Sequence, residues 1–487
     1  MRIESSPSRD LPRGFCYAVL GLIVLLFAVR NLPWHLDDYD QAKQAFTSYE
    51  MVKGSEWLFQ HTPTGRVATK PPLAGWISAA LYGLGSGWEI AWRLPSFAAA
   101  LLVLLTLWRT GSRLSGGHVG GLLAAGMFGL NFFTPRLATL VRTDMLLGAF
   151  IFFAGWLVLE KVRTAAPWTT GERCLLFALV LGTLLTKGPI AYAFLAPGLL
   201  AYYLITGRLS SDGRSGHAWA GWWCWLAPMM IFIGWVVLGL LRDPEFKEQV
   251  IFREFLGRFT VGESARHNNF PPGFYILNFL GKALPWSLLL PAAFFFRPVR
   301  QAVRTDRPLL WLLCWTVGGL LFMECVPSKR FDRIFPVLPP ACLLLAAAAR
   351  HVPTAQVRLV AAASAGLAVL LTGGYSGAKV ARAFRDNARG LLLFGKDVRA
   401  SLRDRPDRLA VMNGKDEAML MYVDRLRFHS KDDARELWAS GDIDCLLLSS
   451  SDLKSMRETL EPFEVLVSVP RLLDKMNGYA LIKRSSR

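Results

Sequence analysis

Long apolar runs alternate with short polar stretches over most of the chain. The hydrocarbon core of a bilayer is about 30 Å thick and a helical residue rises about 1.5 Å, so a spanning helix needs about 20 mostly apolar residues. The stronger runs, with short flanks added, are residues 14–32, 120–133, 144–159, 174–185, 190–205, 222–241, 279–296, 309–325, 335–349 and 359–371, and two weaker ones are 73–84 and 94–108. We therefore predict an all-α polytopic membrane bundle of about 11–13 transmembrane helices.

Two longer polar regions interrupt this pattern. The first is a loop of residues 34–72, between the first two apolar segments, and the second is the tail beyond about residue 376, where charge density rises. Short apolar runs in the tail alternate with charged, helix-like segments such as residues 431–439, which indicates a small soluble α/β domain. The short runs are residues 408–412, 444–448, 465–469 and 479–482. We predict a transmembrane domain over residues 1–375, loop included, and a soluble periplasmic domain over residues 376–487.

Composition supports the membrane prediction and argues against a nucleic-acid partner. The 487 residues are 53% hydrophobic and 19% charged, against about 25% charged in an average soluble domain, and the mean hydropathy is +0.32. The net charge of +18 is carried in short loops and near span ends, as with Arg2, Arg9 and Arg13, which is the positive-inside pattern. It predicts a cytoplasmic N-terminus and an extracytoplasmic loop after the first span. The first apolar run could also be a signal peptide, but no small-residue cleavage site follows it at Arg30-Asn31-Leu32-Pro33-Trp34, which favours an uncleaved anchor. The seven cysteines show no CxxC or Cys/His spacing, so no disulfide framework or zinc site is predicted.

The loop after the first span opens with a dense acidic cluster, His35-Leu36-Asp37-Asp38-Tyr39-Asp40. Like charges so close together raise one another's pKa and are costly to hold at a membrane surface. A helix N-terminus with acidic first-turn residues is the alternative interpretation of the same pattern. Charged residues near other span ends favour a catalytic role for the acids.

Three further charges lie where spans begin or end. Lys70 precedes Pro71-Pro72, which disfavours helix there, and it is placed either to bind a lipid phosphate or to snorkel toward the interface. Asp144 begins an apolar run, and a carboxylate at membrane depth is functional by default because burying it without a partner is costly. Lys187 lies between two spans, either as a functional cation or as an ordinary loop charge.

A last group of charges, Lys329, Arg330, Asp332 and Arg333, precedes the run that begins at Phe335. Carboxylates together with phosphate-binding Lys and Arg suit a reaction whose donor is a lipid phosphate or pyrophosphate. One carboxylate would deprotonate the acceptor as general base, and the cations would stabilise the negative charge that develops on the leaving phosphate. The residues therefore favour group transfer from a lipid-linked donor.

Seven short motifs occur in the order and at the spacing of a known family. They are DDxxxA from Asp37, KPPL from Lys70, RLPS from Arg93, RTDMLLGAF from Arg142, TKGP from Thr186, PW from Pro285 and SKR…PxLPP from Ser328. This order resembles the bacterial polyprenyl-phosphate-sugar-dependent glycosyltransferases, which include the lipid A aminoarabinose transferases and, more distantly, the protein O-mannosyltransferases. The resemblance covers about residues 30–345.

The resemblance implies a C-type glycosyltransferase fold in a bacterial inner membrane. It implies inverting transfer of a sugar from undecaprenyl phosphate to lipid A, another glycan or a lipid, with the active site facing the periplasm. Asp37 would be the general base, Asp38 the second acid of the pair, and Asp144 would orient the acceptor or assist the base. The cations implied to bind the donor phosphate are Lys70, Lys187, Lys329, Arg330 and Arg333, and the residues implied to position substrate are His267 and Trp286.

Three residues depart from the family pattern. Thr69 stands where some members have an acid before KPP, Asp40 replaces an arginine, and Arg333 replaces a tyrosine. The first change removes a carboxylate from a metal site that would be shared with His267, so no metal ligand is assigned and dependence on a divalent cation stays open. All three changes lie near the sugar or the phosphate, which leaves the sugar and the acceptor open.

Two other functions fit part of the pattern. A protein O-glycosyltransferase shares the early motifs and would glycosylate serine or threonine of exported proteins. A multi-span transporter or lipid flippase would also explain the helices and the charges within the membrane. It would not explain the long acidic loop or the soluble tail, and no repeated halves are visible.

Overall fold

The computed structural model of the chain describes residues 11–36, 39–207, 220–258, 270–386, 388–402, 408–412, 417–469 and 478–485. These residues are mostly helical, with one small sheet. They divide into two compact units, which we call the helical unit and the mixed unit. The helical unit comprises Met1–Arg30, Thr69–Ala74 and Arg93–Gly377, and the mixed unit comprises Asn31–Ala68, Gly75–Trp92 and Ala378–Arg487.

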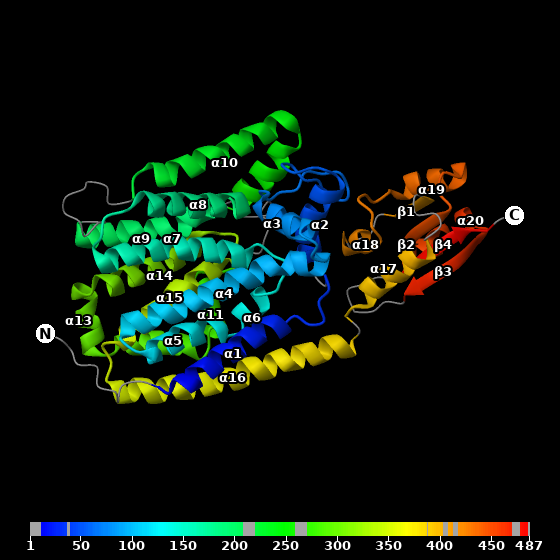
Figure 1. Cartoon of the computed structure of the whole chain (residues 1–487). Helices are drawn as coiled ribbons and strands as arrows, with labels where there is room; N and C mark the ends of the chain where they lie inside the picture. Colours follow the sequence, from blue (N-terminus) through cyan, green and yellow to red (C-terminus); the bar gives the residue numbers. More distant parts are fainter. Residues whose placement is uncertain are drawn as a thin grey trace. The chain divides into compact units, whose positions relative to one another are not determined.

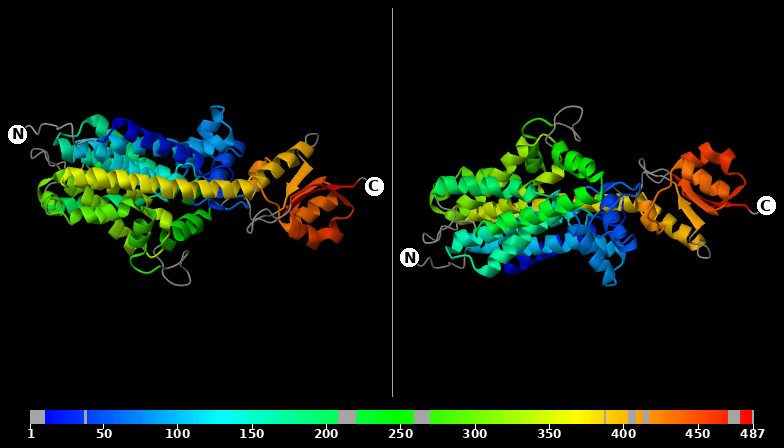
Figure 2. Two further views of the ribbon diagram at one scale, coloured as in Figure 1. Left: turned by 90° about the horizontal axis from the view of Figure 1, so that it is seen from below. Right: turned by 90° about the horizontal axis from the view of Figure 1, so that it is seen from above.

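Helices of very different lengths build the helical unit, and the long ones run side by side (Figure 1). In chain order they are α1 (Arg13–Val29), α4 (Trp88–Ser115), α5 (His118–Gly129), α6 (Thr134–Leu137), α7 (Asp144–Thr164), α8 (Thr170–Lys187), α9 (Ile190–Thr206), α10 (Trp223–Arg242), α11 (Phe274–Lys282), α12 (Trp286–Phe294), α13 (Arg297–Thr305), α14 (Arg307–Cys325), α15 (Leu338–Ala349) and α16 (Thr354–Arg385). A π-helix (Lys247–Phe255) and a 3₁₀-helix (Leu256–Arg258) follow α10, and a 3₁₀-helix (Phe331–Val337) leads into α15. Figure 2 shows α16 running along one side of this bundle as a single long helix.

The prediction of a polytopic membrane protein is confirmed. Among the described residues, six helical segments are long and apolar enough to cross a bilayer, and a bent pair of helices brings the number to seven. Four shorter apolar helices, α1, α3 (Leu73–Gly83), α5 and α9, coincide with other predicted runs. The full count of about twelve spans stays a prediction.

One predicted span, residues 279–296, is broken in the structure. It falls on α11 and α12, which meet at an angle of 112°. Pro285 stands at the break, and proline disfavours helix at the residue before it, which explains why α11 does not continue into α12. The hydrophobic run alone could not show this break, because Pro285 interrupts neither its length nor its apolar character.

Small residues let the central helices pack closely. A Cβ built on Gly318 of α14 would lie 2.7 Å from the backbone nitrogen of Gly198 on α9, so only glycine allows the two backbones to approach this far. Close approach at small residues is the usual way in which helices associate inside a membrane, where hydrophobic burial gives no net drive. Around them, the segment Phe331–Ala349 is almost completely buried and forms the centre of the unit.

The mixed unit contains a four-stranded sheet with the order β1-β2-β4-β3. The strands are β1 (Leu409–Val411), β2 (Cys445–Ser449), β3 (Phe463–Val469) and β4 (Tyr479–Arg484). β1 and β2 are parallel, while β4 pairs antiparallel with both β2 and β3. The helices α19 (Lys431–Ser440) and α20 (Ser450–Leu460) contribute Trp438 and Met456 to the core against the sheet. The predicted strands and the predicted helix at 431–439 are therefore confirmed.

Residues of the predicted loop 34–72 belong to the mixed unit as well. The helix α2 (Tyr39–Lys53) packs against α18 (Glu417–Tyr422). The carboxylate of Glu50 is fully buried and pairs with the guanidinium of Arg427 at 2.5 Å, and Tyr49 donates a hydrogen bond to Asp424. The mixed unit also includes α17 (Gly390–Ser401). Polar contacts thus join two segments that are more than 360 residues apart in the sequence.

Candidate functional site

Asp144 and Lys187 form a buried ion pair in the helical unit. The ammonium of Lys187 donates to Asp144 Oδ1 at 2.6 Å, and about nine-tenths of each side chain is shielded from solvent. Asp144 is the first residue of α7 and Lys187 the last residue of α8. The positive end of one helix dipole therefore lies at the carboxylate and the negative end of the other at the ammonium, which stabilises both charges.

The TKGP motif explains how Lys187 is positioned. Gly188 has φ +80°, a conformation that side chains other than glycine rarely adopt, and a Cβ there would lie 2.6 Å from the ring of Phe255. This glycine ends α8, and Pro189 then caps the start of α9. The turn holds the lysine at the end of its helix instead of letting it extend into solvent.

The residues before α7 bring further charge to Asp144. Lys70 and Arg142 lie close enough to act electrostatically on its carboxylate. Ser96 of α4 donates hydrogen bonds to the carbonyls of Leu140 and Arg142, which fixes the backbone that leads into Asp144. The RLPS and RTD motifs, almost 50 residues apart, therefore meet at one place.

Asp332 is a second buried carboxylate of this site. Its Oδ2 accepts from Arg142 Nη1 at 2.8 Å and lies 3.8 Å from Arg330 Nη2. Within the described residues its Oδ1 is buried without a hydrogen-bond partner, and so is Thr143 Oγ1. The sequence pattern shows the charge of Asp332 before an apolar run but does not by itself indicate a role for it. The rule that singled out Asp144, a carboxylate at the edge of an apolar run, would have found it.

The other cations of the SKR segment have partners of their own. The ammonium of Lys329 pairs with Glu324 at 2.8 Å and is 4% exposed. Arg333, also buried, donates to the carbonyl and the hydroxyl of Ser328. Arg330 thus reaches the Asp332 cluster, whereas Lys329 and Arg333 help to order the segment before α15. Their predicted contact with the donor phosphate stays a prediction.

Trp286 lies apart from these charges. Its indole is fully buried against Gly126 and donates to the carbonyl of Leu130 at 2.9 Å. Packing inside the bundle accounts for all of these contacts, and the predicted role in positioning substrate stays untested. Asp37, Asp38 and His267 lie outside the described residues.

The described residues contain no group of three His, Cys, Asp or Glu side chains that could hold a metal ion. At position 69, where the family resemblance implies an acid, this chain has a buried threonine, whose hydroxyl is a poor replacement for a carboxylate ligand.

Among the described residues, the site combines two buried carboxylates with at least four cations. Asp144 and Asp332 lie near each other, and Lys70, Arg142, Lys187 and Arg330 surround them. This excess of positive charge can bind a phosphate, while a carboxylate held in an ion pair can accept a hydrogen bond from a sugar or acceptor hydroxyl.

Comparisons with known proteins agree with this arrangement. The family model described as dolichyl-phosphate-mannose-protein mannosyltransferase matches residues 69–235, which include Lys70, Asp144 and Lys187. The chain is 28% identical over 347 residues to undecaprenyl phosphate-alpha-4-amino-4-deoxy-L-arabinose arabinosyl transferase 1 of Sodalis glossinidius, a match of 68% of this chain and 59% of that protein. A transferase of the same description from Pseudomonas aeruginosa is 28% identical over 63% of this chain and 54% of its own length. The matched part thus spans less than three fifths of these curated relatives.

Solved structures share the fold. ArnT from Cupriavidus metallidurans, solved bound to undecaprenyl phosphate, superposes with a TM-score of 0.69 at 18% identity, over 97% of this chain and 98% of that one. An oligosaccharyltransferase from Archaeoglobus fulgidus superposes with a TM-score of 0.54 at 10% identity, over 92% of this chain and 71% of that one. The family model, the relatives and the common fold all point to the polyprenyl-phosphate-sugar-dependent glycosyltransferases, the family that the ordered motifs resemble.

Proposed function

We propose that this chain transfers a sugar from undecaprenyl phosphate to lipid A, another glycan or a lipid at the periplasmic face of a bacterial inner membrane. The observation that carries the proposal is the buried cluster at the start of α7, where Asp144 pairs with Lys187 and lies beside Lys70 and Arg142. Buried charge of this kind at membrane depth is retained for function more than for stability. The activity for which the Sodalis glossinidius relative is named supports the same class of donor.

In the proposed reaction an acceptor hydroxyl attacks the anomeric carbon of the donor sugar. The bond from that carbon to the phosphate oxygen breaks, and its electron pair leaves with undecaprenyl phosphate, so a single displacement inverts the anomeric centre. Asp37 takes the proton of the hydroxyl as general base. Lys70 and Lys187 stabilise the negative charge that grows on the leaving phosphate, and such preorganised cations act more strongly in a water-poor site than in solution.

The two carboxylates of the cluster have supporting roles in this proposal. Asp144 orients the acceptor hydroxyl through the oxygen that does not pair with Lys187. Asp332 holds Arg142 next to the phosphate through their bond of 2.8 Å. The mixed unit is assigned to the periplasmic side, because the positive-inside pattern places the loop 34–72 there.

Comparative mass spectrometry of lipids, glycans and exported proteins tests this proposal, with cells that contain or lack the gene. We expect a sugar mass to disappear from a lipid or glycan when the gene is lost and to return with the wild-type gene. Asp37→Asn should restore less than about 1% of it, since general-base catalysis contributes about 100-fold or more. Asp432→Asn, at an exposed position of α19, serves as the matched control and should restore it fully. Unchanged glycan, lipid and glycoprotein masses on loss of the gene would refute the transferase.

The same experiment separates the protein O-glycosyltransferase. The matching family model is described by protein mannosyl transfer, so this acceptor class has one observation in its favour. Loss of a hexose from serine or threonine of exported proteins, with lipids unchanged, would assign the chain to that class. Transfer that persists in excess chelator would exclude dependence on a divalent cation.

A further inference from the structure

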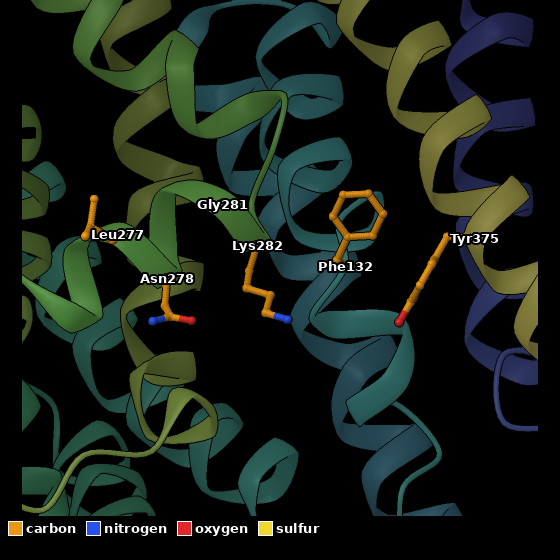
Figure 3. A pocket seen from close by; sticks show the side chains of 6 residues that line it. All are labelled: Phe132, Leu277, Asn278, Gly281, Lys282 and Tyr375. Carbon is orange, nitrogen blue, oxygen red and sulfur yellow. The ribbon is translucent and has the colours of Figure 1, made fainter. Parts of the chain in front are cut away.

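A cavity of about 540 Å³ opens in the helical unit, apart from the Asp144 cluster. Its lining consists of Phe132, Leu277, Asn278, Gly281, Lys282 and Tyr375, which come from α11, from the turn after α5 and from α16 (Figure 3). Its volume falls within the range of about 300–1,000 Å³ that is usual for small-molecule sites. Leu277 is 70% exposed and Tyr375 42% exposed although both lie on predicted membrane-spanning helices, so the opening faces the bilayer.

Lys282 supplies a cation to this cavity at an unusual place. It is the last residue of α11, at the 112° break between α11 and α12. Its ammonium lies 5.3 Å from the centre of the Phe331 ring, and no carboxylate of the described residues pairs with it. A cation at membrane depth is costly without a partner, so an anion from outside the chain would complete this site. Broken helices inside membranes are common places for binding ions and substrates.

The other lining residues suit an anionic headgroup. Figure 3 shows the ammonium of Lys282 and the hydroxyl of Tyr375 pointing into the same space from opposite sides, with Phe132 between the two side chains. Asn278 lies one helical turn before Lys282, and its amide nitrogen donates to the carbonyl of Phe274. The guanidinium of Arg30 lies 5.2 Å from the Tyr375 ring centre and adds a second positive charge. Positive groups and hydrogen-bonding groups thus line one space, beside aromatic rings.

We propose that this cavity binds the phosphate of a second lipid, the acceptor, while the Asp144 cluster binds the phosphate of the donor. The inference rests on the proposed function. Lys282 lies over the ring of Phe331, and the next residue, Asp332, belongs to the Asp144 cluster, so one short segment connects the cavity with the cluster. Two separate groups of cations, Lys282 with Arg30 in one and the cations around Asp144 in the other, fit two phosphate-bearing lipids better than one. The acceptor is therefore a phosphorylated lipid, of which lipid A is an example.

Binding of four probes to the purified full chain in detergent tests the cavity. The probes are lipid A, the same lipid A after removal of its phosphates, undecaprenyl phosphate and inorganic phosphate. We expect Lys282→Met to weaken binding of lipid A about tenfold or more, the effect of one lost charge-assisted hydrogen bond. Lys282→Arg should bind within about threefold of wild type, and Asn278→Asp should weaken binding by repelling the phosphate. Lys247→Met is the matched control, because Lys247 also lies over an aromatic ring, Phe252, but outside the cavity.

Four outcomes would overturn the assignment. They are lipid A affinity that is unchanged in Lys282→Met, an equal loss for dephosphorylated lipid A, an equal loss for undecaprenyl phosphate, and inorganic phosphate that binds as tightly as lipid A. An equal loss for undecaprenyl phosphate would mean that the cavity binds the donor lipid. Inorganic phosphate that binds as tightly as lipid A would mean that the cavity recognises a phosphate alone and not a lipid. Wild-type protein that binds lipid A through its phosphates but moves no sugar would refute the proposed function and leave the cavity as a lipid-phosphate site. If both proposals hold, Lys282→Met raises KM for lipid A and leaves kcat within about threefold.

Discussion

The ion pair between Asp144 and Lys187 is the residue-scale feature on which the site depends. A buried pair of this kind gains little net stability, because the desolvation of both charges offsets their attraction. Removing one partner is different, since it leaves an uncompensated charge and costs about 3–5 kcal/mol. The structural and the catalytic roles of the ion pair can therefore be separated by comparing single and double variants.

We expect Lys187→Met and Asp144→Asn each to abolish most sugar transfer, and Lys187→Met to lower thermal stability by about 3 kcal/mol because Asp144 is left unpaired. The double variant should regain most of the stability, since no buried charge remains, yet stay inactive. Thermal unfolding in detergent and transfer to the acceptor measure the two effects. Recovery of activity in the double variant would show that the pair has only a structural role.

Glu417 gives a pH-dependent prediction in the mixed unit. Burial raises the pKa of Glu417 to about 7, and nearby Lys43 lowers it only in part. The folded protein therefore loses stability as pH rises from about 4.5 through 7, up to about 3 kcal/mol at about 1.4 kcal/mol per pKa unit. Glu417→Gln removes this loss, so we expect slower hydrogen exchange in α18 than in wild type at pH 8, after correction for the intrinsic rate, and no difference at pH 4.5. Glu464→Gln, at an exposed position of β3, is the control; an equal gain at both pH values would contradict the titration.

The sequence indicated which charges matter but not which ones meet. Asp144 and Lys187 could be singled out because each stands at the edge of an apolar run, where charge is costly. Their pairing, and the bond between Arg142 and Asp332, join residues 43 and 190 positions apart. Such contacts depend on how the helices pack, and single-sequence patterns carry no information about that. Asp37, Asp38 and His267 stay predictions.

At the scale of elements, local sequence patterns predicted both the type and the position of the short strands well. The predicted strands 444–448, 465–469 and 479–482 agree with β2, β3 and β4 to within two residues. The apolar runs found the membrane helices, but they could not show that α11 and α12 are separate. A hydropathy run records what a segment is made of and not whether its axis bends.

The glycine contact between α9 and α14 leads to an element-scale prediction. We expect Gly318→Ala to destabilise the protein by about 1–3 kcal/mol, because the new Cβ meets the backbone of Gly198 and cannot be relieved by a side-chain rotation. Gly366→Ala is the matched control, since that helical glycine on α16 has nothing within 4 Å of the added Cβ. It should be neutral or stabilising by up to about 1 kcal/mol. Equal melting temperatures for the two variants would contradict the close packing.

At the scale of the whole molecule, the chain is not divided at a single point in the sequence. The mixed unit takes in residues from the loop after the first span as well as from the tail. The predicted boundary near residue 376 rested on where apolar runs stop, and such a pattern cannot show that an early loop and a late domain share a core. The polar contacts of Tyr49 and Glu50 with residues of the tail could be known only from the structure.

This shared core predicts that the loop and the tail unfold together. Glu50 is fully buried, and burial raises its pKa even with Arg427 and the backbone N–H of His61 as partners. Arg427→Met leaves the carboxylate without its cation. Since the Arg427 side chain is 42% exposed, solvent screens the pair, and we expect a loss of about 2 kcal/mol instead of the full cost of a buried charge.

Hydrogen exchange of the full-length protein measures this loss in both segments. We expect exchange to quicken by about tenfold or more in residues 39–63 and, in parallel, in residues 417–428, because segments of one cooperative unit open together. The defect should shrink as pH falls and Glu50 takes up a proton. Arg435→Met, which breaks only the exposed pair with Asp432, should leave both segments unchanged. Faster exchange confined to residues 417–428 would mean that the loop and the tail fold independently. The mixed unit would then consist of two separate folding units.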